Sequence, residues 1–226
     1  MEEHKNKNKN LKEDVYEKIF KAIVKGNLVP GERIIEKEIA NKMSISRTPV
    51  RQALKKLEEQ KLIEISPYKG AIVKDIGYDE TIDLLKTREV IETYLCKEAA
   101  KKITKKEITK LNEILNSYEK AYENHNYEEM LMKNFEFHTY IAQISDNKVA
   151  EDIYENLRAR LNILTSKSLP FADRDLLTFE EHRKIVEALE NKDTKKVIQS
   201  IKNHNENIKE VLLKRFKSKE GIFNSN

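Results

Sequence analysis

Two arginines and a threonine open a short amphipathic segment, SRTPVRQAL, at positions 46–54. Arg47 and Arg51 are four residues apart, so a helix would place them on one face, beside Thr48. The planar fork of an arginine can grip a guanine edge or a phosphate with two hydrogen bonds. Ser46 and Thr48 can also reach a phosphate at the helix start, where free N–H groups favour an anion. An isolated pair of arginines would indicate only a solvated helix face, so the surrounding elements decide the interpretation.

Three histidines further along the chain offer a second kind of chemistry. His138, His182 and His204 fall in separate amphipathic segments, and Asn134 precedes His138 by four residues on the same helical face. Imidazole is the commonest protein ligand for divalent first-row metals, and three imidazoles leave coordination positions open for water or an effector. A lone histidine is more often structural, so the metal hypothesis depends on whether the three converge in one core.

The arginine-bearing segment is predicted to be the third helix of a small N-terminal domain. Residues 11–26 form an amphipathic first helix, a Pro-Gly turn follows, and IIEKEIANKM at 34–43 forms a short second helix. Ser46 is the expected N-cap of the third helix, over residues 47–60. Its expected underside is apolar and consists of Val50, Leu54 and Leu57. Two short alternating segments within residues 62–76 then form a hairpin, which completes the order of a winged helix-turn-helix.

The stretch PGERIIEKEIANKMSISRTPVRQALKKLEEQKLIEISPYKGAIV resembles the DNA-binding domain of the GntR family of bacterial transcription regulators. The resemblance carries the family's DNA contacts onto Arg47, Thr48 and Arg51, and extends them to Lys37 and the wing tip at Lys69 and Gly70. Lysine at position 37, where many members have arginine, suggests a phosphate contact rather than a bidentate base contact. The glycine would let the wing approach the minor groove, although a plain turn glycine is equally consistent.

Composition and charge set the limits on the whole chain. The 226 residues are 38% apolar and 36% charged, with five Gly and four Pro, which predicts a mainly helical protein. Residues 1–75 carry 17 Lys+Arg against 12 Asp+Glu, whereas the rest carry 26 against 27, so the basic excess lies where DNA would be met. A polar N-terminus, no apolar run long enough for a bilayer and the single Cys96 predict a cytoplasmic protein without membrane contact.

The rest of the chain is predicted to be an all-α bundle. We expect a winged helix-turn-helix domain over 11–75, a linker at 76–80 and a helical domain for effector binding and dimerisation over 81–216. Residues 1–10 and 217–226 are expected to be tails. The fifth bundle helix is expected to open with a capping box between Thr178 and Glu181.

The histidine segments NFEFH, TFEEHRKI and KNHNENI are similar to the FCD effector domain of the FadR branch of GntR regulators. The resemblance implies that His138, His182 and His204 hold a divalent transition metal, with zinc first and nickel or manganese as alternatives. The fourth ligand position falls on Asn134 instead of the usual aspartate. The missing negative charge should weaken the affinity of the site for a metal ion. The resemblance also suggests Arg88 as a carboxylate-binding residue; the alternative is a salt bridge to Glu89 or Glu92.

These expectations define a regulator rather than an enzyme. We expect a homodimer that binds a palindromic double-stranded operator and responds to a small carboxylate effector at the metal. A metal-dependent hydrolase or lyase with an accessory DNA-binding domain is the alternative, but no HExxH, nucleophile elbow, phosphate-binding glycine loop or obvious general base supports it. A nonspecific DNA-coating protein is a third possibility, which would lack a strong operator preference.

Overall fold

The computed structural model describes residues 2–66, 70–165 and 172–223, and it divides the chain into two compact units. The first comprises residues 1–76 with 162–168, and the second comprises 77–161 with 169–226. The boundary after Ile76 falls inside the expected linker at 76–80. Among the described residues, no helix is both long and apolar enough to cross a membrane.

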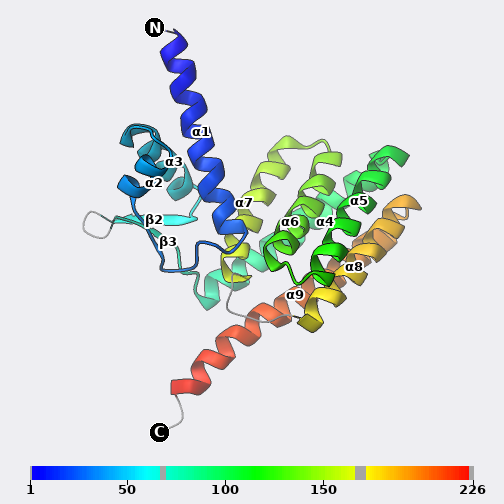
Figure 1. The fold of residues 1–226 in the computed structure, drawn as a ribbon. Helices are drawn as coiled ribbons and strands as arrows, with labels where there is room; N and C mark the ends of the chain where they lie inside the picture. The colour runs from blue at the N-terminus through cyan, green and yellow to red at the C-terminus, as the bar shows by residue number, and fades with distance from the viewer. Residues whose placement is uncertain (1, 67–69, 166–171, 224–226) are drawn as a thin grey trace. The chain divides into compact units, whose positions relative to one another are not determined.

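The N-terminal unit is a winged helix-turn-helix, as the sequence predicts (Figure 1). Its elements are α1 (Glu2–Val24), β1 (Arg33–Ile34), α2 (Glu36–Lys42), α3 (Arg47–Glu59), β2 (Ile63–Ser66) and β3 (Gly70–Val73). The strands form an antiparallel sheet in the order β1-β3-β2, with Arg33 opposite Ile72 and Ile65 opposite Ala71. The predicted underside of α3 is buried, since Val50, Leu54 and Leu57 are at most 1% exposed.

Three local features of this unit differ from the expectations. Ile34 belongs to a two-residue strand that pairs with β3, so the second helix begins at Glu36 and not at position 34. Ser46 occupies the N-cap position of α3, but its side chain makes no capping hydrogen bond. Helix α1 continues back to Glu2 through the expected tail, because residues 2–10 contain no glycine or proline to end it.

The second unit is entirely helical in its described part. Its helices are α4 (Tyr78–Lys102), α5 (Lys105–Glu123), α6 (Tyr127–Ile144), α7 (Lys148–Thr165), α8 (Ala172–Glu190) and α9 (Thr194–Phe223). Helix α4 lies against α6 and α9, while α5 lies against α6 and α8. Their contacts enclose a core that includes Leu111, Phe137, Ile185, Leu189 and Ile201. The bundle therefore brings α4, α6, α8 and α9 together around its interior.

Helix ends in this unit also depart from the predicted positions. Helix α8 begins at Ala172, so Thr178 lies inside the helix and cannot cap it. A capping box is present instead at α5, between Thr104 and Glu107. Helix α9 runs to Phe223, through most of the expected tail at 217–226. Residues 172–177 contain no glycine or proline, so α8 can begin before the cap signal at Thr178.

Candidate functional sites

The first candidate site is the outer face of α3. Arg47, Thr48 and Arg51 are exposed, opposite the buried apolar underside. The Arg51 Nε donates to Glu36 Oε2 of α2 at 2.9 Å, and about two thirds of the Arg51 side chain is accessible. Such an exposed pair is weak, of order 1 kcal/mol or less, so DNA can replace it. Glu36, which the sequence analysis did not single out, thus holds Arg51 in place when DNA is absent.

The remaining predicted DNA contacts are partly described. Lys37 on α2 and Ser46 before α3 are exposed. Gly70 begins β3 with φ +73°, a conformation that disfavours any residue with a Cβ, so a backbone requirement accounts for this glycine. Arg33 of β1 reaches the same point, about 3.9 Å from where a Cβ on Gly70 would lie, and adds a cation that the sequence analysis missed. Lys69 lies outside the described residues.

The second candidate site is a cluster of three buried histidines inside the helical unit. His138 of α6, His182 of α8 and His204 of α9 are each at most 2% exposed, and their ring centroids are 4.8–4.9 Å apart. The Nε2 atoms of His138 and His182 are 3.1 Å apart. The three potential ligand atoms all lie within 4.8 Å of one another. The structure therefore brings together the three histidines that the sequence analysis selected.

Two carboxylates orient the rings. Glu92 Oε1 is 2.7 Å from His138 Nδ1, and Glu181 Oε2 is 2.7 Å from His204 Nδ1. In each ring the Nδ1–H donates to the carboxylate, which leaves Nε2 with its lone pair, the form in which histidine binds a metal. Sequence analysis missed both carboxylates as partners, because each belongs to a different helix from the ring it orients.

The unpaired atoms of the cluster fit a metal ion. His204 Nε2 is buried without a hydrogen-bond partner, as is Asn134 Oδ1 one turn before His138 on α6, a costly arrangement unless something binds there. A tetrahedral zinc with Zn–N distances of about 2.0–2.1 Å would place two ligand nitrogens roughly 3.3 Å apart. The observed 3.1 Å between two imidazole nitrogens is close to that separation. The donor set thus suits a divalent transition metal with open coordination positions.

Electrostatics keep the rings in the ligating form. Burial lowers the pKa of His138 and of His182 well below the usual range, and lowers the pKa of His204 as well. Neutral imidazole is therefore the favoured state at neutral pH. Burial raises the pKa of Glu92, but the charge of Arg88 and the interactions with His138 and His204 together outweigh burial, so this pKa lies well below normal and the group stays a carboxylate.

Arg88 lies in the same buried network. Its Nε donates to Glu92 Oε2 at 3.1 Å, so of the two alternative salt bridges the structure shows the one to Glu92. The same carboxylate accepts from Asn205 Nδ2 at 2.8 Å and from the hydroxyl of Tyr154. Arg88 is thus one carboxylate away from His138, and whether it binds an effector carboxylate stays a prediction.

Arg158 of α7 is a further cation that sequence analysis missed. It is 3% exposed, and its Nη1 and Nη2 donate to the main-chain oxygens of Phe135 and Asn134 at 3.0 and 3.1 Å. Burial lowers the pKa of this guanidinium to about 10. The segment NLRARLN does not indicate that this arginine is buried. Its hydrogen bonds to α6 distinguish it from an ordinary surface arginine.

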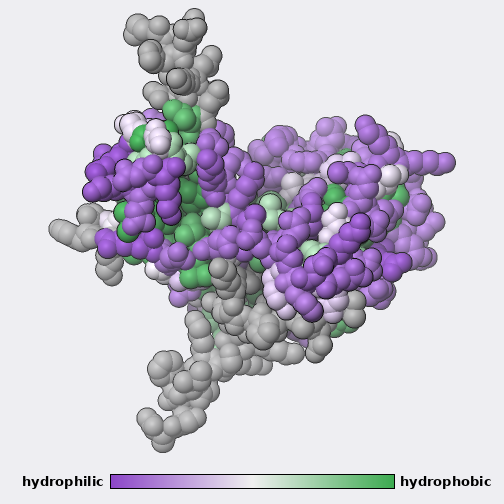
Figure 2. All heavy atoms as spheres, in the orientation of Figure 1, coloured by the Kyte–Doolittle hydropathy of each residue, from purple (hydrophilic) through white to green (hydrophobic). Residues whose placement is uncertain are grey.

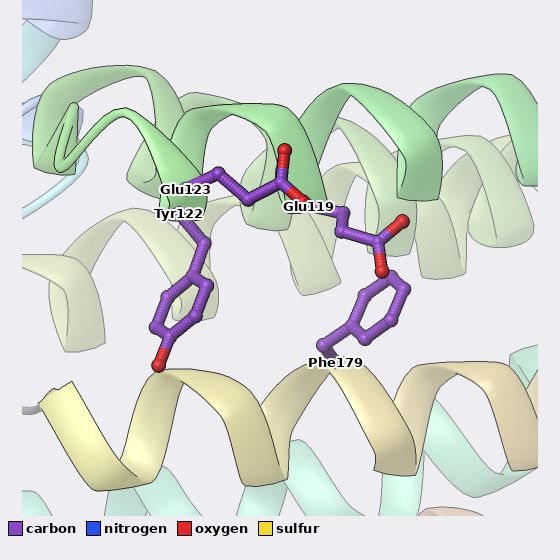
Figure 3. A pocket seen from close by; sticks show the side chains of 4 residues that line it. All are labelled: Glu119, Tyr122, Glu123 and Phe179. Atoms are coloured by element: carbon purple, nitrogen blue, oxygen red, sulfur yellow. The ribbon is translucent and has the colours of Figure 1, made fainter.

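A separate surface pocket lies between α5 and α8, and no predicted site residue lines it. The side chains of Glu119, Tyr122 and Glu123 come from α5 and that of Phe179 from α8 (Figure 3). Its two carboxylates are exposed and lie beside two aromatic rings, so they do not form a buried metal site as the three histidines could. We assign it no role.

Comparisons with known proteins agree with this division. The family model described as "Bacterial regulatory proteins, gntR family" matches residues 11–73, and that of the "FCD domain" matches residues 83–207. The "Uxu operon regulator" of Haemophilus influenzae is 31% identical over 216 residues, covering 88% of this chain and 77% of its own. The "HTH-type transcriptional repressor RspR" of Escherichia coli (strain K12) is 28% identical over 200 residues, covering 88% of each. The solved structure "E. coli McbR/YncC" superposes with a TM-score of 0.85 at 22% identity, over 91% of this chain and 98% of that one.

Proposed function

Since this chain belongs to the GntR family of bacterial transcription regulators, in the branch with an FCD domain, it is a DNA-binding regulator and not an enzyme. We propose that it binds a palindromic operator as a homodimer, and that a small organic acid at a metal in the helical unit controls this binding. The observation that carries the proposal is the burial of His138, His182 and His204 side by side, with the His204 Nε2 atom left without a hydrogen-bond partner.

The three imidazoles would hold the metal, with the Asn134 side chain as a fourth candidate ligand. When bound, such a cation supplies a Lewis-acidic centre whose open positions accept a carboxylate oxygen. Glu92 and Glu181 keep His138 and His204 in the correct tautomer for this. Zinc is the first choice for a site rich in imidazole, with nickel or manganese as alternatives.

The DNA-binding half of the proposal rests on exposed side chains of α2 and α3. Arg47 and Arg51 would contact base edges or phosphates, Ser46 and Thr48 would contact phosphates, and Lys37 would contact a phosphate. The wing would add Gly70 and Lys69, and its neighbour Arg33 strengthens the positive charge there. A regulator of this kind meets its operator in the cytoplasm.

An apolar surface on the helical unit supports the homodimer. Val90 and Tyr94 of α4 are 68% and 43% exposed, and Val149 and Ile153 of α7 are 72% and 46% exposed. Each pair has i,i+4 spacing, and Asn147 Nδ2 donates to the Tyr94 hydroxyl at 3.0 Å, which joins the start of α7 to α4. By contrast, the face of the helical unit where α5 and α8 lie is mostly hydrophilic (Figure 2). An isologous pairing of two copies would cover these four side chains.

Effector binding would then act through the spacing of two recognition helices. Two half-sites must match the helical repeat of DNA, so a small rearrangement of the dimer changes operator affinity. The effector needs to distinguish the two states by a coupling free energy of typically ~1–3 kcal/mol.

The proposal is tested by selecting bound DNA from random sequence with metal-loaded and metal-stripped protein, with and without small carboxylates. We expect one enriched palindrome, and a change in its affinity of about 5–150-fold when the correct acid is present. Equal enrichment of all sequences would indicate a nonspecific DNA-coating protein instead. Metal analysis of the purified protein and of a His182→Ala variant tests the ligand set independently; equal metal content in both would contradict it.

A further inference from the structure

The outer face of the small sheet in the N-terminal unit carries one arginine. Arg33 lies opposite Ile72 in the pairing of β1 with β3, and Glu64 lies opposite Ile72 in the pairing of β2 with β3. The next position along each of β1 and β3 is buried, since Ile34 and its partner Ala71 are 5% and 4% exposed. Side chains alternate between the two faces of a strand, so Arg33, Ile72 and Glu64 share the outer face.

The Arg33 side chain extends along this face toward the end of the hairpin at which β3 begins. Its Cα is paired with that of Ile72, but its Nε and Nη2 lie 3.9 and 4.0 Å from the point where a Cβ on Gly70 would be. Gly70 precedes Ile72 by two residues, which is about 7 Å along a strand. The side chain therefore spans this distance and places its guanidinium beside a residue that has no side chain to cover it.

The guanidinium has donors available for a partner outside this unit. Arg33 is exposed, and no described residue forms an ion pair or a hydrogen bond with its side chain. Glu64, the carboxylate on the same face, lies two strands away across Ile72 and does not pair with it. Arg51 of α3, by contrast, is held by Glu36. All five N–H groups of Arg33 can therefore be offered to a ligand.

We propose that Arg33 enters the minor groove beside the sequence that α3 contacts, and that it selects A·T base pairs there. This inference rests on the proposed function, because it adds a specificity-determining residue to operator binding. In the minor groove an A·T pair presents only acceptors, whereas a G·C pair adds the 2-amino donor of guanine. A guanidinium is itself only a donor, so it matches the first pair and conflicts with the second.

The shape of the groove and that of the protein favour the same contact. Runs of A·T pairs narrow the minor groove, and the more negative potential there attracts arginine. Gly70 is exposed and has no Cβ, so the backbone next to the guanidinium can approach a narrow groove closely. A bulky side chain at this position would hold the guanidinium away from the base edges.

The test uses the operator recovered by selection from random sequence, with full-length protein and fluorescence anisotropy. The base pairs that flank the enriched motif are made A·T, G·C or inosine·cytosine. Inosine lacks the 2-amino group of guanine but presents the same atoms in the major groove, so it isolates minor-groove recognition. We expect A·T and inosine·cytosine flanks to bind at least about fivefold more tightly than G·C flanks.

An Arg33→Ala variant should bind the three flanks within about twofold of one another, because the donor that distinguishes them is gone. Lys18→Ala is the matched control. It removes a cation of α1 whose side chain is 60% exposed, and it should leave the flank preference unchanged. Thermal melts of both variants verify that the N-terminal unit remains folded.

Four results would overturn the inference. These are equal binding of all three flanks by the wild-type protein, inosine·cytosine behaving like G·C, an unchanged preference in Arg33→Ala, or no enriched sequence at all. A uniform loss of affinity in Arg33→Ala, with a salt slope lower by about 1, would indicate a phosphate contact and would also contradict it. If the preference depends on Arg33 but the operator is not palindromic or responds to no carboxylate, the inference stands and the proposed regulation fails.

Discussion

Glu181 provides the sharpest test of the proposed metal centre, because it contacts the proposed ligand His204 without being a ligand itself. Its Oε2 is 2.7 Å from His204 Nδ1, and its Oε1 accepts from Asn207 Nδ2 at 2.7 Å. The Glu181→Gln change keeps an oxygen that can accept from Nδ1–H but removes the negative charge that makes the ring a stronger ligand. Loss of such an outer partner typically weakens metal binding 10–100-fold, and the retained hydrogen bond sets the expectation near the lower end.

A tenfold loss corresponds to about 1.4 kcal/mol of binding free energy. At a fixed excess of metal, the free energy of unfolding falls by the same amount, because the metal binds only the folded state. For a protein of this size, that loss should lower the melting temperature of the metal-loaded form by about 3–6 °C. The melting temperature of the metal-free protein should change much less, because glutamine at position 181 still accepts the hydrogen bond from His204 Nδ1.

The assay is a competition titration of metal-stripped protein against a fluorescent zinc chelator, with thermal melts in the presence and absence of metal. Glu180→Gln is the matched control, because the Glu180 side chain, next to Glu181 in the sequence, is about half exposed and forms an ion pair with the exposed Arg183 at 3.8 Å. Wild-type metal affinity in the Glu181→Gln variant would refute the role of this carboxylate. A matching fall in the metal-free melting temperature would mean that Glu181 stabilises the bundle rather than the metal.

Three further predictions concern other parts of the molecule. Arg51→Ala should weaken operator binding by ~1–3 kcal/mol and relax base preference, whereas Glu36→Ala should tighten binding by less than about 1 kcal/mol, as measured by fluorescence anisotropy. Val90→Asp should give a folded monomer in sedimentation equilibrium, and Tyr127→Asp, an equally polar change at an exposed side chain outside the α4 and α7 surface, should not. Burial raises the pKa of the Cys96 thiol well above normal, so it should react with a disulfide reagent at neutral pH only after denaturant is added; rapid reaction of the native protein would contradict its buried position.

A structural feature could be predicted from the sequence where all the residues that determine it lie in one segment. The alternation of Val50 and Leu54 with Arg47 and Arg51 on a single helix determines which side is buried and which is exposed, and no distant partner is needed. Strand β1 could not be predicted in this way. It is two residues long, and it exists only because β3, nearly 40 positions later, pairs with it.

The histidine site shows the same distinction. Its three histidines could be identified from the sequence, but the carboxylates that orient two of them could not. Glu92 and His138 are on α4 and α6, and the Glu181 that precedes His182 orients His204 of α9 instead of its own neighbour. Such pairs follow from how the helices cross, a property of packing that local periodicity does not encode.

The placement of negative charge in this site has a functional consequence. A carboxylate at position 134 would bind the metal directly and cancel one of its charges. In this chain the carboxylates of Glu92 and Glu181 stand behind the imidazoles, where they strengthen the ligands without occupying a coordination position. A metal bound at this site would thus be held by neutral donors, unlike one with an aspartate at position 134.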